Sequence, residues 1–304
     1  MARMPTLLDL TSQGDVATIS DESQLSSFKL MDPQQLYELW ERQPWSAHAI
    51  DLTRDKADWA ALDTAEREHI AWNLSSFFIG EERVTTQFSG LVRAYESQSE
   101  EAFLTTQQVD EARHAQHFNR FYEQVVGYDG TFEARLERAR EDLNEPFKVL
   151  FDEHLVDAQE RLLADPSDLD AKIDFVTTYH MVIEGTLALT GQYFITDVFE
   201  QRGIFPGFLE GFRNISTDEH RHVAYGTWFL QSKVRESPAA AERIQAKLTE
   251  LLPVAAGVFV PPGYQLGDEY EVLGRSSTEV NQFAFTALTR RLKVIGVGLG
   301  AAAA

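Results

Sequence analysis

Apolar residues recur three and four positions apart along most of the chain, which is the spacing of amphipathic helices. Runs that alternate apolar and polar residues, as strands do, are few. We expect long helices over about 64–95, 100–126, 170–200, 208–234 and 278–294, with one or two more in 131–164. Polar, glycine or proline-rich breaks separate them near 97–100, 127–130, 201–207 and 253–277. The pattern predicts an all-α helix bundle.

The chain has 304 residues, of which 43% are hydrophobic and 25% charged, as in ordinary globular proteins. That length allows one large domain or two small ones. We expect a single domain over 1–304, with a helical core at about 63–235 and a C-terminal extension at about 236–304. The chain has no cysteine, which excludes disulfides, thiolate metal sites and cysteine nucleophiles.

The charge balance is strongly acidic, with 27 basic and 48 acidic residues and a net charge of −21. Such a surface repels phosphate backbones and anionic lipids, so we expect neither nucleic acid nor a membrane surface as a partner. No uncharged apolar run reaches the roughly 18 residues of a membrane span, and the N-terminal segment does not have the pattern of a signal peptide. The expected location is the cytoplasm.

The motif Glu-x-x-His occurs three times. Glu66 lies three residues after Asp63 at a helix start, where it completes a capping box, so the pair Glu66 and His69 is not interpreted as a metal site. The other two pairs lie on apolar helix faces, where an unpaired carboxylate is costly. A buried ion pair would explain either pair alone, and so would a metal ion. These two pairs are Glu111 with His114 and Glu219 with His222.

Two single acids, Glu81 and Glu184, also lie on apolar helix faces. Glu82, next to Glu81, faces smaller and more polar residues and is predicted to lie at the surface. Either buried acid alone is equally well explained by a hydrogen bond to a nearby donor.

The lengths of the predicted hairpins bring these acids together. Glu81 and Glu111 are 30 residues apart with a polar break midway, and Glu184 and Glu219 are 35 apart with a turn near their midpoint. Four antiparallel helices would therefore present two single glutamates and two Glu-x-x-His pairs at one level. This is the ligand arrangement of di-iron and manganese–iron carboxylate bundles. It suits two cations with open positions for oxygen.

At these residues the chain resembles the ferritin-like superfamily, and within it the ribonucleotide reductase small subunit and its ligand-binding oxidase relatives. The stretches that carry the resemblance are GEERVT (80–85), DEARH (110–114), YHMVIEGTLALTG (179–191), DEHRHVAYGT (218–227) and IDLTRDKADW (50–59). It implies a four-helix metal-binding core with extra flanking helices.

The resemblance also implies roles for individual residues. Glu81, Glu111 and His114 would hold one metal, with Glu111 as a bridging ligand. The second metal would be held by Glu184, Glu219 and His222. Asp218 would accept a hydrogen bond from His114, and Trp45 would be a packing residue or part of an electron route.

Two groups within this family differ at recognisable positions. A tyrosyl-radical reductase subunit carries a tyrosine four residues after the first histidine ligand, where this chain has Phe118, and it ends in an acidic tail with a redox-active tyrosine, unlike LKVIGVGLGAAAA. The ligand-binding oxidases carry a valine three residues after the first glutamate and a tyrosine five before the third. Val84 and Tyr179 stand at those positions.

The oxidase resemblance implies a manganese–iron pair, with di-iron as the alternative, that activates dioxygen for two-electron C–H oxidation. It further implies an ether crosslink between Val84 and Tyr179 and a long-chain fatty-acid-like ligand. In a regular α-helix Tyr179 would point well away from Glu184, and a π-bulge would reduce that offset. His180, on the same face as Glu184, is a rival functional residue.

Two other functions stay open at this point. One is a reductase small subunit, which would need a large catalytic partner. The other is a lipid-binding or metal-storage bundle without turnover. The sequence determines neither the metal pair nor the substrate, and a homodimer is one expectation for the assembly.

Overall fold

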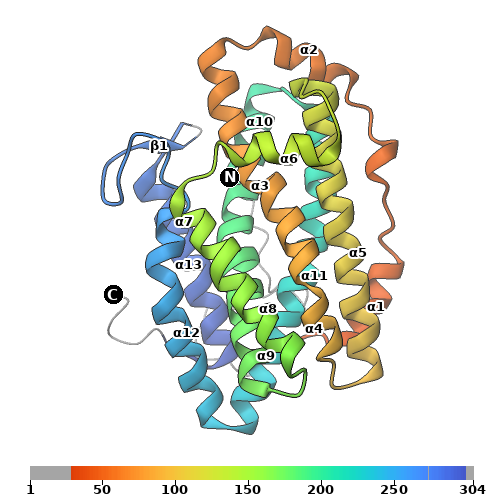
Figure 1. Cartoon of the computed structure of the whole chain (residues 1–304), viewed down its shortest axis with the longest axis vertical. Coiled ribbons are helices and arrows are strands. Elements are labelled where there is room, and N and C mark those ends of the chain that lie inside the picture. The colour runs from red at the N-terminus through yellow and green to blue at the C-terminus, as the bar shows by residue number, and fades with distance from the viewer. Residues whose placement is uncertain (1–28, 273, 299–304) are drawn as a thin grey trace.

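The computed structural model describes residues 29–272 and 274–298, and that part of the chain is almost entirely helical (Figure 1). Its α-helices are α1 (Pro33–Glu41), α2 (Thr53–Ala61), α3 (Thr64–Gln87), α4 (Ser89–Arg93), α5 (Gln98–Phe121), α6 (Phe132–Arg140), α7 (Glu145–Lys148), α8 (Leu155–Ala164), α9 (Leu169–Val176), α10 (Leu189–Arg202), α11 (Pro206–Glu236), α12 (Pro238–Gly257) and α13 (Ser277–Ile295). The predicted all-α class is confirmed.

Three segments of the described chain are π-helical, and one short turn is of the 3-10 type. The π-helices are η5 (Tyr122–Val126), η6 (Val149–His154) and η7 (Thr177–Ala188), and the 3-10 turn is η4 (Ala47–Ala49). Two short strands, β1 (Glu271–Val272) and β2 (Arg275–Ser276), pair antiparallel with Glu271 opposite Ser276. They interrupt the 253–277 region, which was predicted to be irregular.

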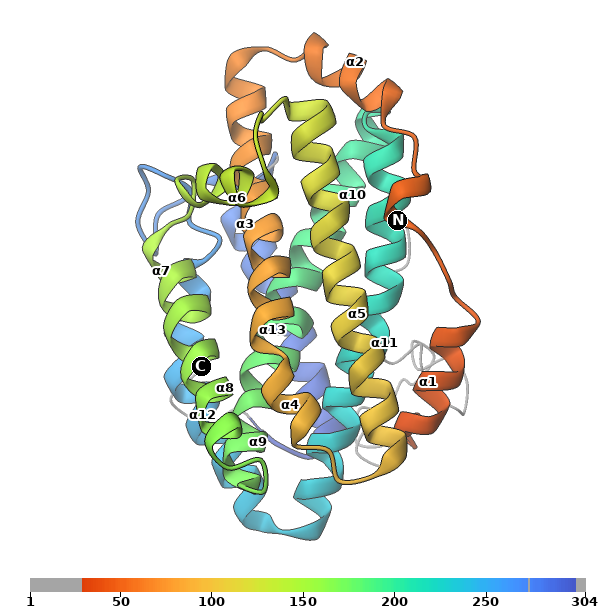
Figure 2. The ribbon, with the colours of Figure 1, turned by 45° about the vertical axis from the view of Figure 1, so that its right-hand side comes forward.

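Four long helical stretches form the centre of the molecule: α3, α5, the run α9–η7–α10, and α11. Figure 2 shows α3, α5, α10 and α11 side by side along the long axis. Helix α3 packs on α5, α5 packs on α11, and α11 packs on η7 and α10. The helices α6 to α8 cover the α3 side, whereas α12 and α13 pack against η7. This is the ferritin-like arrangement expected from the sequence.

Side-chain caps set where the central helices begin. Asp63 accepts a hydrogen bond from the Glu66 backbone N–H, and the Glu66 side chain accepts one from the Asp63 N–H, so the predicted capping box is confirmed. The Ser97 and Asp168 side chains cap α5 and α9 by accepting from the backbone N–H groups of Glu100 and Ala171. These caps satisfy N–H groups that have no partner within the helix.

The turn before α11 is held by acids from a distant part of the chain. Phe205 has a left-handed backbone (φ 56°), which is costly for a residue other than glycine. The Asp58 carboxylate accepts from the Phe205 N–H at 2.9 Å, and Asp55 accepts from the N–H groups of Gly207 and Phe208 at 2.9 and 2.6 Å. Helix α2 therefore fixes the start of the helix that carries Glu219 and His222.

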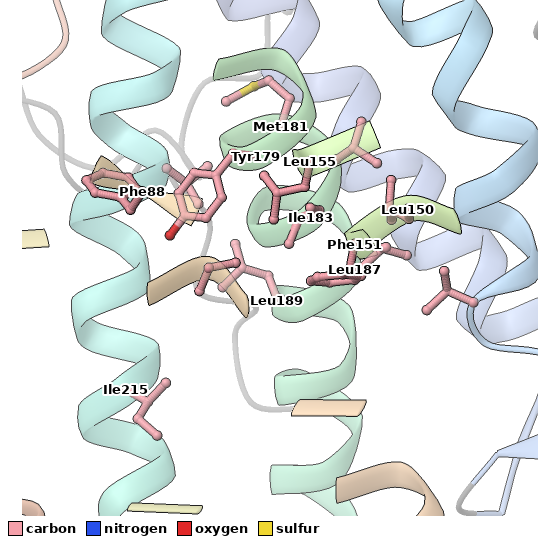
Figure 3. Packing of buried hydrophobic residues seen from close by; sticks show 14 of the residues in the cluster. Phe88, Leu150, Phe151, Leu155, Tyr179, Met181, Ile183, Leu187, Leu189 and Ile215 are labelled. Carbon is pink, nitrogen blue, oxygen red and sulfur yellow. The ribbon is translucent and has the colours of Figure 1, made fainter. Parts of the chain in front are cut away.

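Two element ends differ from the sequence-based expectation. The helix expected to continue to about residue 95 ends at Gln87, and a short helix follows Phe88. The fully buried Phe88 ring packs against Tyr179, which links this break to the core (Figure 3). Helix α12 was not predicted, and it extends to Gly257 through Pro253, the first part of the region expected to be irregular.

Most of the core is a large cluster of aliphatic and aromatic side chains around the four central helices, and a smaller cluster lies around Phe194 and Tyr270. Figure 3 shows a part of it, including Tyr179 and Met181 from η7, Leu150 from η6 and Leu155 from α8. Over the described residues, no helix is long and apolar enough to cross a membrane. The predicted absence of a signal peptide concerns a segment outside the described residues.

Candidate metal centre

Each of the four central helices contributes to one buried cluster of acids and histidines. Helix α3 supplies Glu81, η7 supplies Glu184, and α5 and α11 each supply a Glu-x-x-His pair. Two groups in the described chain have ligand atoms that all lie within 4.8 Å of one another: Glu81, Glu111, His114 and Glu219, and Glu111, Glu184, Glu219 and His222. Glu111 and Glu219 belong to both groups and so lie between the two positions.

The two histidines point the same ring atom, Nδ1, into the cluster. His114 Nδ1 lies 3.3 Å from Glu81 Oε2, 3.4 Å from Glu111 Oε2 and 3.6 Å from Glu219 Oε1. His222 Nδ1 lies 2.9 Å from Glu111 Oε1 and 3.4 Å from Glu184 Oε1. Both rings are fully buried, so the cluster is shielded from bulk water.

Several polar atoms of this cluster have no hydrogen-bond partner among the described residues, namely Glu111 Oε2, Glu184 Oε2, Glu219 Oε2 and His222 Nδ1. Buried carboxylate oxygens without partners are costly, and a bound cation would satisfy them. Glutamate oxygens and imidazole nitrogens are ligands that manganese and iron accept. The residues present therefore fit a pair of such metals.

A second layer of charges holds both histidines by their other nitrogen. His114 Nε2 lies 3.1 Å from Asp218 Oδ2, and His222 Nε2 lies 3.3 Å from Asp110 Oδ2. The buried Arg221 donates to both aspartates, at 3.0 Å to Asp110 and in a short contact to Asp218. Each aspartate thus directs Nδ1 of its histidine inward.

Trp45 joins this second layer from the segment before α2. Its indole Nε1 donates to Asp218 Oδ2 at 2.7 Å, and its ring stacks on His114 with centroids 6.2 Å apart. Trp45 is therefore a hydrogen-bonded neighbour of the cluster as well as a packing residue.

Burial and close charges displace the pKa values of this cluster in the metal-free protein. Burial raises the pKa of Glu81 to about 8, and burial together with Glu219 raises that of Glu184. Burial also acts to raise the pKa of Glu111, but the neighbouring His222 and His114 hold it well below its usual value. Burial disfavours the charged histidines, yet the surrounding carboxylates raise the pKa values of His114 and His222 well above 6.5.

We expect metal binding to release protons and to strengthen as the pH rises. At pH 7 the pKa of about 8 leaves Glu81 largely protonated, and the surrounding carboxylates favour the protonated forms of His114 and His222, whereas a metal binds the deprotonated forms. Affinity for Mn²⁺ should therefore fall as the pH falls below about 8. Calorimetric titration in buffers of different ionisation enthalpy measures the proton count. The Asp218→Asn variant should release fewer protons when it binds Mn²⁺, because Asp218 stabilises the protonated form of His114. Binding of Mn²⁺ to the wild type without proton release would contradict this prediction.

The π-helix η7 changes where Tyr179 points. Hydrogen bonds in a π-helix join residues five apart, so Tyr179 and Glu184 lie near the same side, which removes the offset expected in a regular α-helix. The Tyr179 hydroxyl donates to Glu111 Oε1 at 2.7 Å. Burial and the nearby Glu111 raise the pKa of Tyr179 well above 10, so the phenol keeps its proton.

A largely apolar pocket reaches the acidic cluster. Its wall includes the four glutamates and, one turn beyond Glu81, the buried Val84. The rest of the wall is largely aliphatic and aromatic and comes from α3, α7, η6, η7, α10 and the region 258–280; it includes Trp72, Phe77, Phe147, Phe151, Ile183, Leu187, Phe194, Val258, Phe259, Val272 and Val280. One side of the cluster therefore faces an apolar pocket.

The sequence-based search missed Asp110 and Arg221. A signal for both was present, because the two ligand helices repeat the pattern Asp-Glu-x-Arg-His at 110–114 and 218–222. His180 does not join the ligand groups; its Nε2 lies 3.3 Å from Gln107 Oε1. Glu66 lies at the helix start described above, and Glu82 is partly exposed.

The comparisons with known proteins agree with this geometry. The sequence family of the ribonucleotide reductase small chain matches residues 23–297. A valine-to-isoleucine variant of an R2-like ligand-binding oxidase, with an anaerobically reconstituted Mn/Fe cofactor, is 27% identical; the match covers 88% of this chain and 94% of that chain with a TM-score of 0.75. A tyrosine-to-phenylalanine variant with an aerobically reconstituted Mn/Fe cofactor matches with the same identity and coverage and a TM-score of 0.74.

Proposed function

The chain belongs to the ribonucleotide reductase small chain family, as an oxidoreductase with a dinuclear metal site, and we propose that it acts as a ligand-binding oxidase that uses manganese and iron to activate dioxygen. One observation carries this proposal. Two overlapping sets of metal-ligating groups share Glu111 and Glu219, and the four glutamates of these sets line an apolar pocket.

The proposed ligands divide between the two metals as the helices present them. Glu81, Glu111 and His114 would hold one metal, and Glu184, Glu219 and His222 would hold the other, with Glu111 shared between them. Glu219 is also within reach of both positions. Two iron ions are the alternative loading, since this donor set suits both metals. When bound, the reduced pair supplies electrons to dioxygen and oxidising power for C–H bonds.

The chain's own residues prepare the site for that chemistry. Asp218 and Asp110 orient the two imidazoles, and the buried walls exclude water. Trp45, hydrogen bonded to Asp218, offers an electron route from outside toward His114. The two-electron C–H oxidation that we propose would act on a substrate in the cavity or on the protein itself.

A long-chain fatty-acid-like ligand suits the cavity because one end of it meets metal-ligating groups and the rest is apolar. Its carboxylate would lie toward the glutamate cluster and its tail among Phe147, Phe151 and Phe194.

Extraction of denatured, metal-loaded protein should release a long-chain acid that mass spectrometry detects. Bulky replacement of Gly191, whose added Cβ would lie 2.7 Å from the Phe77 ring on the cavity wall, should reduce its amount several-fold, whereas Glu66→Ala should not. An empty extract from aerobically prepared wild type would contradict a lipid ligand.

We further propose that Val84 and Tyr179 form an ether crosslink. The new bond joins Val84 Cβ to the Tyr179 oxygen, and one C–H and one O–H bond are lost. The protein loses two protons and two electrons in this step. Together with two electrons from the reduced metals and two further protons, they reduce one dioxygen to two waters. What supports the proposal is placement: Val84 lines the cavity beside Glu81, and the Tyr179 hydroxyl contacts Glu111.

Oxygen uptake tests the proposed function against its alternatives. Protein loaded anaerobically with Mn²⁺ and Fe²⁺ should consume dioxygen in proportion to its metal pairs, whereas a storage or lipid-binding bundle without turnover should consume little. A reductase small subunit should form a tyrosyl radical and co-purify with a large chain; at the radical position this chain has Phe118, packed among Phe77, Phe208 and Phe212.

A cytoplasmic location and a homodimer stay predictions.

A further inference from the structure

Tyr225 is a fully buried tyrosine on α11, three residues beyond His222, that the chemistry above does not use. Its hydroxyl donates to Glu100 Oε1 at 2.5 Å, the short distance of an O–H bonded to an ionised carboxylate. Burial and the facing Glu100 raise the pKa of Tyr225 well above 10, so its phenol is protonated at rest.

Glu100 can accept a proton and is connected to the surface by hydrogen bonds. It is only 1% exposed and lies in the first turn of α5, where the helix dipole favours a negative charge. Lys172 Nζ donates to Glu100 at 2.8 Å and to Glu96 at 3.2 Å. The Glu96 side chain is 47% exposed and also accepts from Lys233 at 2.7 Å. These contacts form a continuous polar path from the Tyr225 hydroxyl to the surface.

Aromatic rings connect Tyr225 in the other direction to the metal centre. Tyr179, whose hydroxyl contacts Glu111, packs on His180 with ring centroids 4.6 Å apart. His180 packs on Tyr225 at 5.3 Å, and Tyr225 packs on the partly buried Trp228 at 6.1 Å. The series runs from the ligand cluster toward the exterior and shares no residue with the Trp45–Asp218–His114 contacts.

We propose that Tyr225 is a redox-active tyrosine, with Glu100 as its proton acceptor and Trp228 as the residue that reduces it again. The proposal rests on the proposed oxidase function, in which the dioxygen-oxidised metal pair is the oxidant. Tyr225 gives one electron through His180 and Tyr179 to that pair and passes its hydroxyl proton to Glu100, which leaves a neutral phenoxyl radical.

Trp228 then restores Tyr225. It returns one electron, while the proton comes back from Glu100, and the oxidised indole loses its N–H proton to water. A soluble reductant such as ascorbate or a thiol reduces Trp228 in turn. The series thus removes oxidising equivalents that neither the substrate nor the pair Val84 and Tyr179 has consumed, and protects the ligand cluster from them.

The first test uses protein in which the crosslink cannot form. Tyr179→Phe keeps the ring contact with His180 but removes the hydroxyl, so oxidising equivalents should reach Tyr225. Anaerobically loaded Tyr179→Phe protein, mixed with dioxygen and frozen rapidly, should show a tyrosyl radical by electron paramagnetic resonance, and ring-deuterated tyrosine should narrow the signal. Adding Tyr225→Phe should abolish the signal, and adding Glu100→Gln should lower its yield at least about tenfold, because the proton acceptor is lost.

Tyr122 provides the matched control. It is equally buried, but among the described residues its hydroxyl bonds directly to two neutral groups, Ser75 Oγ at 2.8 Å and the Ala71 carbonyl at 3.0 Å, and the nearest carboxylate, Asp142, bonds to Ser75 instead. Adding Tyr122→Phe should leave the radical unchanged. A signal that survives Tyr225→Phe, or that disappears equally with Tyr122→Phe, would overturn the assignment.

The second test needs no metal and so separates this inference from the oxidase proposal. Metal-free protein carries 3-aminotyrosine, a more easily oxidised analogue, in place of either Tyr225 or Tyr122, and a flash-generated ruthenium(III) complex serves as the oxidant. The aminotyrosyl radical signal should form at position 225, because Trp228 passes the electron from this residue to the oxidant. The signal should fall at least about tenfold with Trp228→Phe, and no radical signal should form at position 122. If the aminotyrosyl radical forms at position 225 but the metal-loaded wild type consumes no dioxygen, only the oxidase proposal is rejected. If no aminotyrosyl radical forms at position 225, the redox role of Tyr225 is rejected.

Discussion

Replacing Glu111 by alanine should remove nearly all tightly bound metal. Glu111 belongs to both ligand groups, so its loss takes a ligand from each position at once. It is also the carboxylate whose charge supports both histidines, with Nδ1 distances of 3.4 Å to His114 and 2.9 Å to His222. Because changes to residues behind the ligands already cost 10- to 100-fold in metal affinity, we expect at least about a 100-fold loss for this shared ligand. Elemental analysis after passage over a chelating resin measures the remaining metal.

The control for this prediction is the third Glu-x-x-His pair. Glu66→Ala removes half of the capping box of α3 and the contact of Glu66 with Arg202, which should cost about 1 kcal/mol of stability and lower the melting temperature slightly. Its metal content should stay near that of the wild type. Equal metal loss from both variants would mean that the ligand assignment is wrong or that the variants lose metal by unfolding, and circular dichroism separates those two cases.

The crosslink prediction has the largest contrast between conditions. Aerobic loading with Mn²⁺ and Fe²⁺ should convert most wild-type protein to a form in which the peptides of Val84 and Tyr179 migrate as one branched species, lighter by two hydrogens than their sum. Abstracting hydrogen from an unactivated valine Cβ requires a strong oxidant held close to it, so the product reports both the geometry of the site and its oxidising power.

Three matched samples should yield the two peptides separately. They are anaerobically loaded wild type, which lacks the oxidant, Tyr179→Phe, which lacks the hydroxyl, and Glu111→Ala, which lacks the metal ligand. Separate peptides from aerobic, fully metallated wild type would reject the crosslink, and the reductase-like or simple binding functions would gain support. Branched peptides from the anaerobic sample would indicate that dioxygen is not the oxidant.

Much of the centre follows from local rules that act along the chain. The helical phase of Glu81 with its apolar neighbours, the Glu-x-x-His spacing in α5 and α11, and the near-equal hairpin lengths together predicted which six side chains meet. The spacing of Asp63 and Glu66 at a helix start is likewise enough to separate Glu66 from these ligands. Such features are readable because backbone geometry alone converts sequence spacing into a position in space.

Other features were decided only by the tertiary structure. The π-helical form of η7, which turns Tyr179 toward Glu111, was suggested only by the family resemblance at Tyr179 and Glu184, because helical periodicity alone predicts a regular α-helix there. The cavity joins α3 to the region 258–280, and Tyr225 meets Glu100 from 125 residues away. The pairing of Asp110 with His222 and Arg221 likewise crosses from α5 to α11. Helical periodicity predicts which way a side chain faces within its own helix, whereas its partner across a helix interface depends on how the helices pack and where a backbone departs from α geometry.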